Sequence, residues 1–171
     1  MTHNHVEDPA CEVAHGASPA EDDGRTLVAV FVSPVAEHLL RFGDELGFRT
    51  VLFDPDPARH SGGRPAVTRL DDVIDATCDV VLTDHHREEI GPVLRDLLKS
   101  PARWIGIMGS PRHEGPHVRA LTELGVAPEE IARVHRPIGL NIGSRTPAEI
   151  ALATVAGLIA DRNGRPGGFA F

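Results

Sequence analysis

The stretch Leu27-Val-Ala-Val-Phe-Val32 decides the fold of this chain. An uninterrupted apolar run of this length is typical of a strand that is buried on both faces of a parallel sheet. Apolar residues then recur at helical spacing from Val35 to Leu46, and Gly47 stands where a glycine commonly ends a helix. The sequence therefore predicts a strand followed directly by a helix.

The same alternation of strand and helix continues along the chain. Further strands are predicted at 49–53, 79–83 and 104–108, with an edge strand at 134–135. Ile90, Val93, Leu94, Leu97 and Leu98 form a continuous apolar stripe and predict a helix. Another helix is expected with Ser110 as its cap and Pro111 in its first turn. A short helix at 127–131 and a last one after Thr146 complete the pattern.

This alternation implies right-handed crossovers and a parallel sheet covered on both faces. We predict a single α/β domain at 26–162, a Rossmann-like doubly wound parallel sheet in three layers. Residues 1–25 lack apolar periodicity and are expected to form a flexible acidic tail. Residues 163–171 are expected to form a C-terminal tail, whose apolar Phe-Ala-Phe ending favours a homodimer.

Charge and composition exclude several classes of partner. A formal net charge of -8 argues against affinity for nucleic-acid phosphates or anionic lipid. No apolar stretch approaches the roughly 20 residues that a membrane helix needs. Cys11 and Cys78 show no paired spacing, and no signal peptide opens the chain, so a cytoplasmic location is expected. Small molecules or proteins fit better as partners.

The run Pro137-Ile-Gly-Leu-Asn-Ile-Gly-Ser-Arg-Thr-Pro-Ala-Glu-Ile150 joins a glycine-bent loop to a strongly specified helix start. Thr146 is a suitable N-cap, Pro147 suits the first helical position, and Glu149 can close a capping box. Gly139 and Gly143 permit unusual backbone geometry. Free amides and the helix dipole at such a start favour a phosphate or carboxylate, and an ordinary capped loop is the alternative.

Ligands of this fold bind beyond the carboxyl ends of the strands, where strand order reverses. Gly109 and Ser110 provide a second glycine-bent turn at that edge. Arg112 and Arg145 can add bidentate contacts to a phosphate, or they can simply be solvated. The predicted binding residues are Ser33, Asp54, Thr83, Gly109, Ser110, Arg112, Gly139, Asn141, Gly143, Arg145 and Thr146.

Other chemical readings of the sequence are less well supported. A dinucleotide site needs a glycine-rich first turn and an acidic residue about 20 positions later. Asp54 is suitably placed, but the turn reads Phe31-Val-Ser-Pro34, so NAD(P) binding is doubtful. Asp84-His85-His86 can be read as metal ligands, as a polar strand end, or as a source of one substrate-facing histidine. Ser110 lacks an assigned base, so no catalytic residue and no metal site are predicted.

The chain resembles the XdhC family of xanthine dehydrogenase accessory proteins, specifically its C-terminal Rossmann domain, from about Leu27 to Ala160. The resemblance rests on Val80-Val-Leu-Thr83, Leu98-Lys-Ser-Pro-Ala102, Trp104-Ile-Gly-Ile-Met-Gly-Ser110, Leu121-x-x-x-Gly125, Pro137-Ile-Gly-Leu-x-Ile-Gly143 and Thr146-Pro-x-Glu-Ile-Ala151.

The resemblance implies a chaperone without turnover of its own. Such a protein binds molybdenum cofactor, as molybdopterin or its cytosine dinucleotide, and assists its sulfuration. It then delivers the cofactor to the apoenzyme of a molybdenum hydroxylase, such as xanthine or carbon monoxide dehydrogenase. Two alternatives remain at this point, which are a small NAD(P)-dependent oxidoreductase and a ligand-free scaffold that pairs with a separate cofactor-binding subunit.

Overall fold

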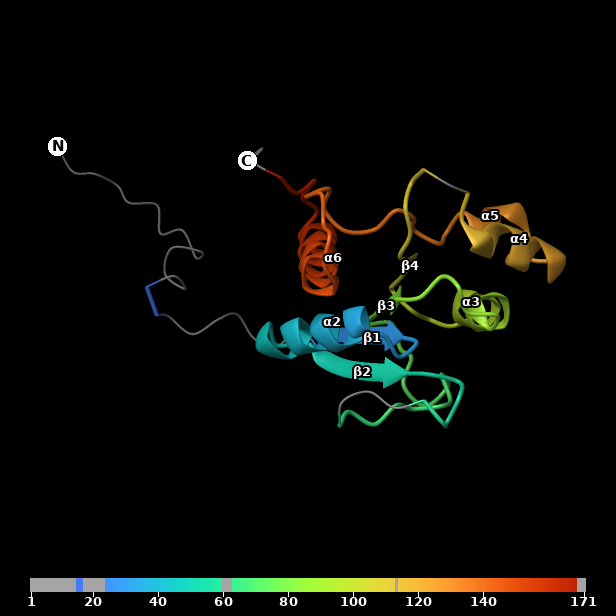
Figure 1. Cartoon of the computed structure of the whole chain (residues 1–171), viewed down its shortest axis with the longest axis horizontal. Helices are drawn as coiled ribbons and strands as arrows, with labels where there is room; N and C mark the ends of the chain where they lie inside the picture. Colours follow the sequence, from blue (N-terminus) through green and yellow to red (C-terminus); the bar gives the residue numbers. More distant parts are fainter. Residues whose placement is uncertain (1–14, 17–23, 60–62, 113, 169–171) are drawn as a thin grey trace.

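The computed structural model of the chain describes residues 15–16, 24–59, 63–112 and 114–168. Strands and helices alternate in it as the apolar pattern predicts (Figure 1). The elements are β1 (Thr26–Val30), α2 (Pro34–Glu45), β2 (Arg49–Phe53), β3 (Cys78–Leu82), α3 (Ile90–Lys99), β4 (Trp104–Ile107), α4 (Pro116–Glu123), α5 (Pro128–Ile131) and α6 (Pro147–Arg162).

The four strands form one parallel sheet in the order β2-β1-β3-β4. Thr26 of β1 lies opposite Arg49 of β2 on one side and Cys78 of β3 on the other. The chain therefore leaves β1 for one neighbour and later returns to pair on its other side. The strand order therefore reverses between β1 and β3. In folds of this kind a crevice lies at such a switch point, beyond the carboxyl ends of the strands.

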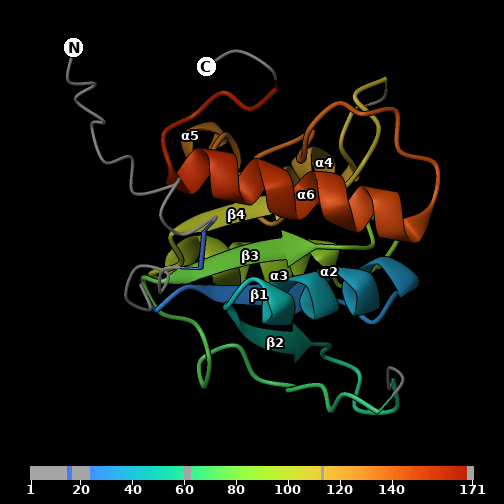
Figure 2. The same ribbon diagram turned by 90° about the vertical axis from the view of Figure 1, so that its left-hand side faces the viewer.

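Helices cover both faces of the sheet, which confirms the predicted doubly wound α/β architecture in three layers. Helices α2 and α6 lie over one face, and α3, α4 and α5 lie behind the other (Figure 2). Strand β1 contributes alternately to the two cores. Leu27 and Ala29 pack in the cluster with α2 and α6, whereas Val28 and Val30 pack in the cluster with α3.

The predicted edge strand at Val134 and His135 is reduced to an isolated bridge between His135 and Gly106. The His135 amide donates to the Ile105 carbonyl, and the Ile107 amide donates to the His135 carbonyl. Val134 instead donates its amide to Ile131 at the end of α5. Pro137 follows closely and has no amide hydrogen, so the ladder cannot extend in that direction.

The prediction of a helix capped by Ser110 is wrong, because α4 begins at Pro116 and its N-cap is Gly115. Ser110 Oγ accepts a hydrogen bond of 3.2 Å from the Arg112 amide and so stabilises a local turn. Pro111 and Pro116 both suit the first position of a helix. The residues after Pro116 pack on the core, because Leu121 of α4 is buried and Val118 and Ala120 are partly buried against the same cluster.

Several expectations about the ends of the chain fall outside the described residues. These are most of the predicted tail 1–25, including Cys11, and the apolar residues 169–171 on which the expected dimer rests. Cys78 is described, and it is buried with a free thiol. Among the described segments, each helix is too short or too polar to cross a membrane.

Candidate functional site

A cavity of about 900 Å³ opens at the carboxyl edge of the sheet, where the loops after β3 and β4 meet the segment before α6. It is lined by Val35, Thr83, His85, Met108, Gly109, Ser110, Pro111, Arg112, Pro137, Ile138, Gly139, Leu140, Asn141, Ile142, Gly143, Ser144, Arg145, Ile150, Ala153 and Thr154. Of the residues predicted to bind a ligand, Ser33, Asp54 and Thr146 lie outside this lining. The two glycine-bent loops therefore do face a common space.

The lining of this cavity is cationic and apolar. Arg112 and Arg145 contribute two guanidinium groups, and His85 contributes an imidazole. None of the described residues that line the cavity is acidic, although the whole chain carries a formal net charge of -8. Met108, Ile138 and Ile150 supply apolar wall. Such a surface suits an anion that is attached to an apolar or flat group.

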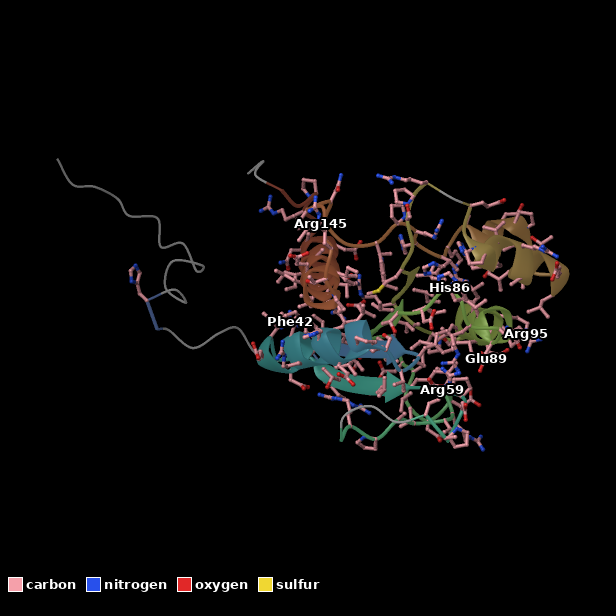
Figure 3. The ribbon with its side chains drawn as sticks, viewed as in Figure 1. Phe42, Arg59, His86, Glu89, Arg95 and Arg145 are labelled. Atoms are coloured by element: carbon pink, nitrogen blue, oxygen red, sulfur yellow. The ribbon has the colours of Figure 1, made fainter. Side chains whose placement is uncertain are left out.

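A second cavity, of about 830 Å³, lies against α3 and the segment 68–74. Its lining contains Asp71, Glu89 and Asp96 as well as Arg69 and Lys99, so it offers no preference for one sign of charge. Figure 3 shows Glu89 on the α3 side of the molecule and Arg145 beside α6. The linings of the two cavities share no described residue, and only the first contains the predicted loops.

Gly109, in the loop after β4, leaves room for Arg136 at the edge of the cavity. A Cβ atom at position 109 would lie 2.6 Å from Arg136 Nη2, which is too close for any substitution without movement. The same Nη2 donates a hydrogen bond of 2.8 Å to the Ser110 carbonyl. Arg136 thus holds the Gly109-Ser110 turn in place. Sequence reasoning missed it, and the only signal was a cation directly before the Pro137 motif.

Gly139 fixes the second loop against α6. Its φ of +83° lies in the left-handed region, and a Cβ atom there would lie 3.0 Å from the backbone of Ala153 and Thr154. Gly157 provides the matching flat surface, because its own Cβ position is 3.0 Å from Gly139 Cα. The Leu140 amide also donates to the Ala153 carbonyl at 3.0 Å. The loop is therefore packed on the helix by its backbone.

The capping box predicted at the start of α6 is present. Thr146 Oγ1 accepts from the Glu149 amide at 3.2 Å, and Glu149 Oε2 accepts from the Thr146 amide at 3.1 Å and from the Arg145 amide at 2.6 Å. The hydrogen bonds from Arg145 and Thr146 lower the pKa of Glu149 below its ordinary value.

The expectation of free amides at this helix start therefore needs correction. The anion that faces them is the carboxylate of Glu149, and Pro147 has no amide hydrogen to offer. The Ala148 amide is the first-turn donor that the box does not use. Thr146 acts as a helix cap, and any cationic attraction to a ligand comes from the side chain of Arg145.

The hydroxyl groups of Ser33 and Thr83 form their hydrogen bonds within the protein, at the turn between β1 and α2. Ser33 Oγ accepts from the Ala36 amide at 3.0 Å and donates to Thr83 Oγ1 at 2.8 Å. Thr83 Oγ1 lies 3.0 Å from the carbonyl oxygens of both Val30 and Phe31, to which it donates. Thr83 thus borders the cavity while its hydroxyl is used inside the protein, and Ser33 serves as the N-cap of α2.

Asp54 is fully buried and holds Arg87. The Arg87 guanidinium donates to both carboxylate oxygens at 3.1 Å, and the amides of Val32 and Asp56 donate to them at 2.9 and 3.0 Å. Burial opposes ionisation, but the hydrogen bonds from Arg87, Val32 and Asp56 outweigh it and lower the pKa of Asp54. Asp54 is therefore a structural anion at this edge. Sequence reasoning did not identify Arg87 as its partner.

His85 is the one member of Asp84-His85-His86 that lines the cavity. Its ring lies 4.1 Å from that of His86, centroid to centroid. Burial lowers the pKa of His85 below its ordinary value, and the charges of His86 and Arg136 lower it further, against an opposing effect of Asp84. Among the described residues, no group of three potential ligands is placed to hold a metal ion.

These features define the class of the protein, a Rossmann-like domain with a cationic and apolar cavity at the carboxyl edge of its sheet. Residues 27–158 match the model of the XdhC Rossmann domain, and the chain belongs to this family. The family predicted from the sequence motifs is thereby confirmed.

Two known proteins illustrate the likeness. Over 75 residues the chain is 44% identical to the uncharacterized protein YqeB of Escherichia coli (strain K12), a match that covers 44% of this chain and 14% of that protein. A crystal structure described as a xanthine dehydrogenase from Bacillus halodurans matches with a TM-score of 0.64 at 26% sequence identity. This match covers 85% of the present chain and 45% of the Bacillus halodurans chain. The chain thus matches less than half the length of either relative.

Proposed function

We propose that this chain serves as an accessory protein of molybdenum hydroxylases, in which the cavity holds the anionic group of a molybdenum cofactor. The observation that carries the proposal is a cavity whose described lining includes Arg112, Arg145 and His85 and no acidic residue, in a chain with a formal net charge of -8. Membership in the XdhC family and the likeness to a protein described as a xanthine dehydrogenase support the choice of cofactor.

The described residues fit the phosphate and the ring of a pterin cofactor rather than its metal. Two guanidinium groups suit a phosphate, and the apolar wall suits the flat ring. The described cysteine, Cys78, is buried at the opposite end of β3, and burial raises the pKa of its thiol. When bound, the cofactor would bring its own molybdenum and dithiolene chemistry, while the chain would bind it, orient it and limit its contact with water.

The two alternative functions are less well supported by the geometry. An NAD(P)-dependent oxidoreductase needs a free carboxylate for the ribose hydroxyls, and both oxygens of Asp54 are already hydrogen-bonded inside the protein. A ligand-free scaffold does not account for a cavity whose described lining carries two arginines and no carboxylate. We therefore propose a cofactor-binding role, with the apoenzyme of a molybdenum hydroxylase as the partner that receives the cofactor.

Arginine substitutions test the ligand claim. We expect Arg112→Ala and Arg145→Ala each to weaken anaerobic binding of molybdopterin by about 1.5–3 kcal/mol, because each removes charged hydrogen bonds to the phosphate. Isothermal titration measures the dissociation constants. Arg119→Ala is the matched control, since Arg119 is an exposed arginine that pairs with Glu123 away from the cavity. An absence of binding by the unmodified chain would refute the proposal.

The pH dependence of anion binding tests the place of His85. Because its pKa is lowered, His85 is neutral at pH 7, and acidification adds a third positive charge to the cavity. We therefore expect the affinity for sulfate, whose own charge stays constant, to change little between about pH 8 and 7 and to rise only as the pH falls below the ordinary histidine pKa of about 6.5. His85→Gln should flatten this rise, whereas His38→Gln, at a histidine of α2 that does not line the cavity, should leave it intact. An unchanged profile in His85→Gln would exclude His85.

A further inference from the structure

We infer that the cavity takes a pterin whose phosphate is a terminal monoester, and that it excludes the form in which this phosphate is joined to a second nucleotide. The inference rests on the proposed function and specifies which form of the cofactor the site accepts. It follows from the state of the other half of the crevice, where dinucleotide-binding domains of this fold hold the rest of a dinucleotide. Four features of the described structure bear on it.

The first turn, between β1 and α2, offers no bare backbone to a pyrophosphate. Phe31 has a φ of +74°, a conformation that glycine adopts freely, but here the position carries a fully buried aromatic ring. The Val32 amide donates to Asp54 Oδ2 at 2.9 Å, and Pro34 has no amide hydrogen. The donors that a glycine-rich turn directs at a diphosphate are therefore used or missing at these positions.

The end of β2 is closed in the same way. In dinucleotide-binding domains an acidic residue at this point accepts hydrogen bonds from the ribose hydroxyls. Here Asp54 is 0% exposed and Arg87 is 7% exposed, and the two form a bidentate pair. The Arg87 guanidinium also lies over the Phe31 ring, 4.6 Å from its centroid. The ring, the cation and the carboxylate form one packed unit with no acceptor left for a ribose.

The outer side of this unit is also secured. Arg87 donates to Glu89 Oε1 at 2.8 Å, so its guanidinium is held by carboxylates from two directions. Releasing Asp54 for a ligand would leave a buried cation with one partner fewer, which is strongly unfavourable. The second half-site therefore cannot open by rotation of a single side chain.

The half of the crevice that stays open matches a dianion. A phosphate monoester carries a charge of about -1.5 to -2 at pH 7, whereas each phosphate of a pyrophosphate diester carries about -1. Arg112 and Arg145 approach the cavity from two different loops, and each can bind two oxygens of a terminal phosphate. Substitution of one phosphate oxygen by a second nucleotide would remove an acceptor and lower the charge.

The test compares two forms of the cofactor on the full chain under anaerobic conditions. We expect molybdopterin to bind at least tenfold more tightly than molybdopterin cytosine dinucleotide in an isothermal titration. Equal or tighter binding of the dinucleotide would overturn this inference while leaving the proposed function intact. Binding of neither form would refute the proposed function itself, and the inference with it.

Simple anions provide a second measurement that needs no cofactor. We expect inorganic phosphate to protect the chain against thermal unfolding at concentrations where dimethyl phosphate, a monoanionic diester, does not. In Arg112→Ala and Arg145→Ala the advantage of inorganic phosphate should shrink at least threefold, and in Arg119→Ala it should persist. Equal protection by both anions in the unmodified chain would contradict selection of a monoester.

Discussion

Replacement of Asp79 by alanine is expected to lower the free energy of unfolding by about 3–5 kcal/mol. Asp79 lies in β3, is 0% exposed, and accepts a hydrogen bond of 2.6 Å from Nε of both Arg103 and Arg162. These partners come from the residue before β4 and from the last residue of α6. One carboxylate therefore joins three segments, and its loss leaves two guanidinium groups close together without their shared anion.

Urea denaturation followed by the fluorescence of Trp104 measures this loss. Asp79→Asn keeps the shape of the side chain and should fall between the wild type and Asp79→Ala, because an amide oxygen still accepts one hydrogen bond. Glu123→Ala removes a carboxylate from a fully exposed pair with Arg119 and should leave stability unchanged within error. A loss of less than about 1 kcal/mol in Asp79→Ala would show that the network is not a stabilising element.

Replacement of Gly139 by alanine is the second large effect, with an expected loss of about 2–4 kcal/mol from backbone strain and overpacking together. The residue has a positive φ, and its Cβ would lie 3.0 Å from backbone atoms of α6. A helix backbone cannot move aside as a flexible side chain can. The loop must therefore lift from α6, which also displaces Asn141 and Arg145 at the cavity.

Gly143→Ala is the matched control for Gly139→Ala. Gly143 has a φ of +68°, but no atom lies within 4 Å of its Cβ position. The expected loss of stability in Gly143→Ala is therefore only that of the left-handed conformation, about 1–2 kcal/mol. The difference between the two variants isolates the close approach of the loop to α6. Equal losses of stability in both would mean that this packing contributes nothing beyond backbone conformation.

Local signals in the sequence account for most of the fold. The buried run that begins at Leu27 defines β1, and the apolar stripe from Ile90 to Leu98 defines α3. Thr146, Pro147 and Glu149 specify the start of α6 through contacts between near neighbours. Such features depend on residues three or four positions apart, which is why they can be read without coordinates.

The start of α4 shows where local signals become ambiguous. Pro111 and Pro116 are both suitable first residues, and the Ser110 cap made the earlier one the better choice from sequence. The position of Arg136 against Gly109 and Ser110 decides the matter, because it holds this segment as a turn. The contact spans 26 residues and leaves no periodic trace in the sequence.

In the candidate site, too, local sequence signals predict some features and contacts between distant residues decide others. The topology rule predicts Gly109, Ser110 and Arg112 at the same edge as the loop before α6, and these three residues and residues 137–145 line one cavity. Asp54 was placed at the correct end of β2, yet its role depends on Arg87, which lies 33 residues away. Its carboxylate is therefore committed to the protein interior rather than to a ligand.

By itself the sequence determined the order of the elements and the parallel doubly wound sheet, because apolar periodicity and helix caps act over short distances. It also predicted the edge of the sheet at which the loops 109–112 and 137–145 meet. Only the tertiary structure decided which polar groups remain available at that edge. Burial forces each charged group to find a partner, and those partners, Arg87 for Asp54 and Arg136 for the Ser110 carbonyl, come from distant segments. The cationic side chains that line the cavity are the two arginines, Arg112 and Arg145, beside the imidazole of His85.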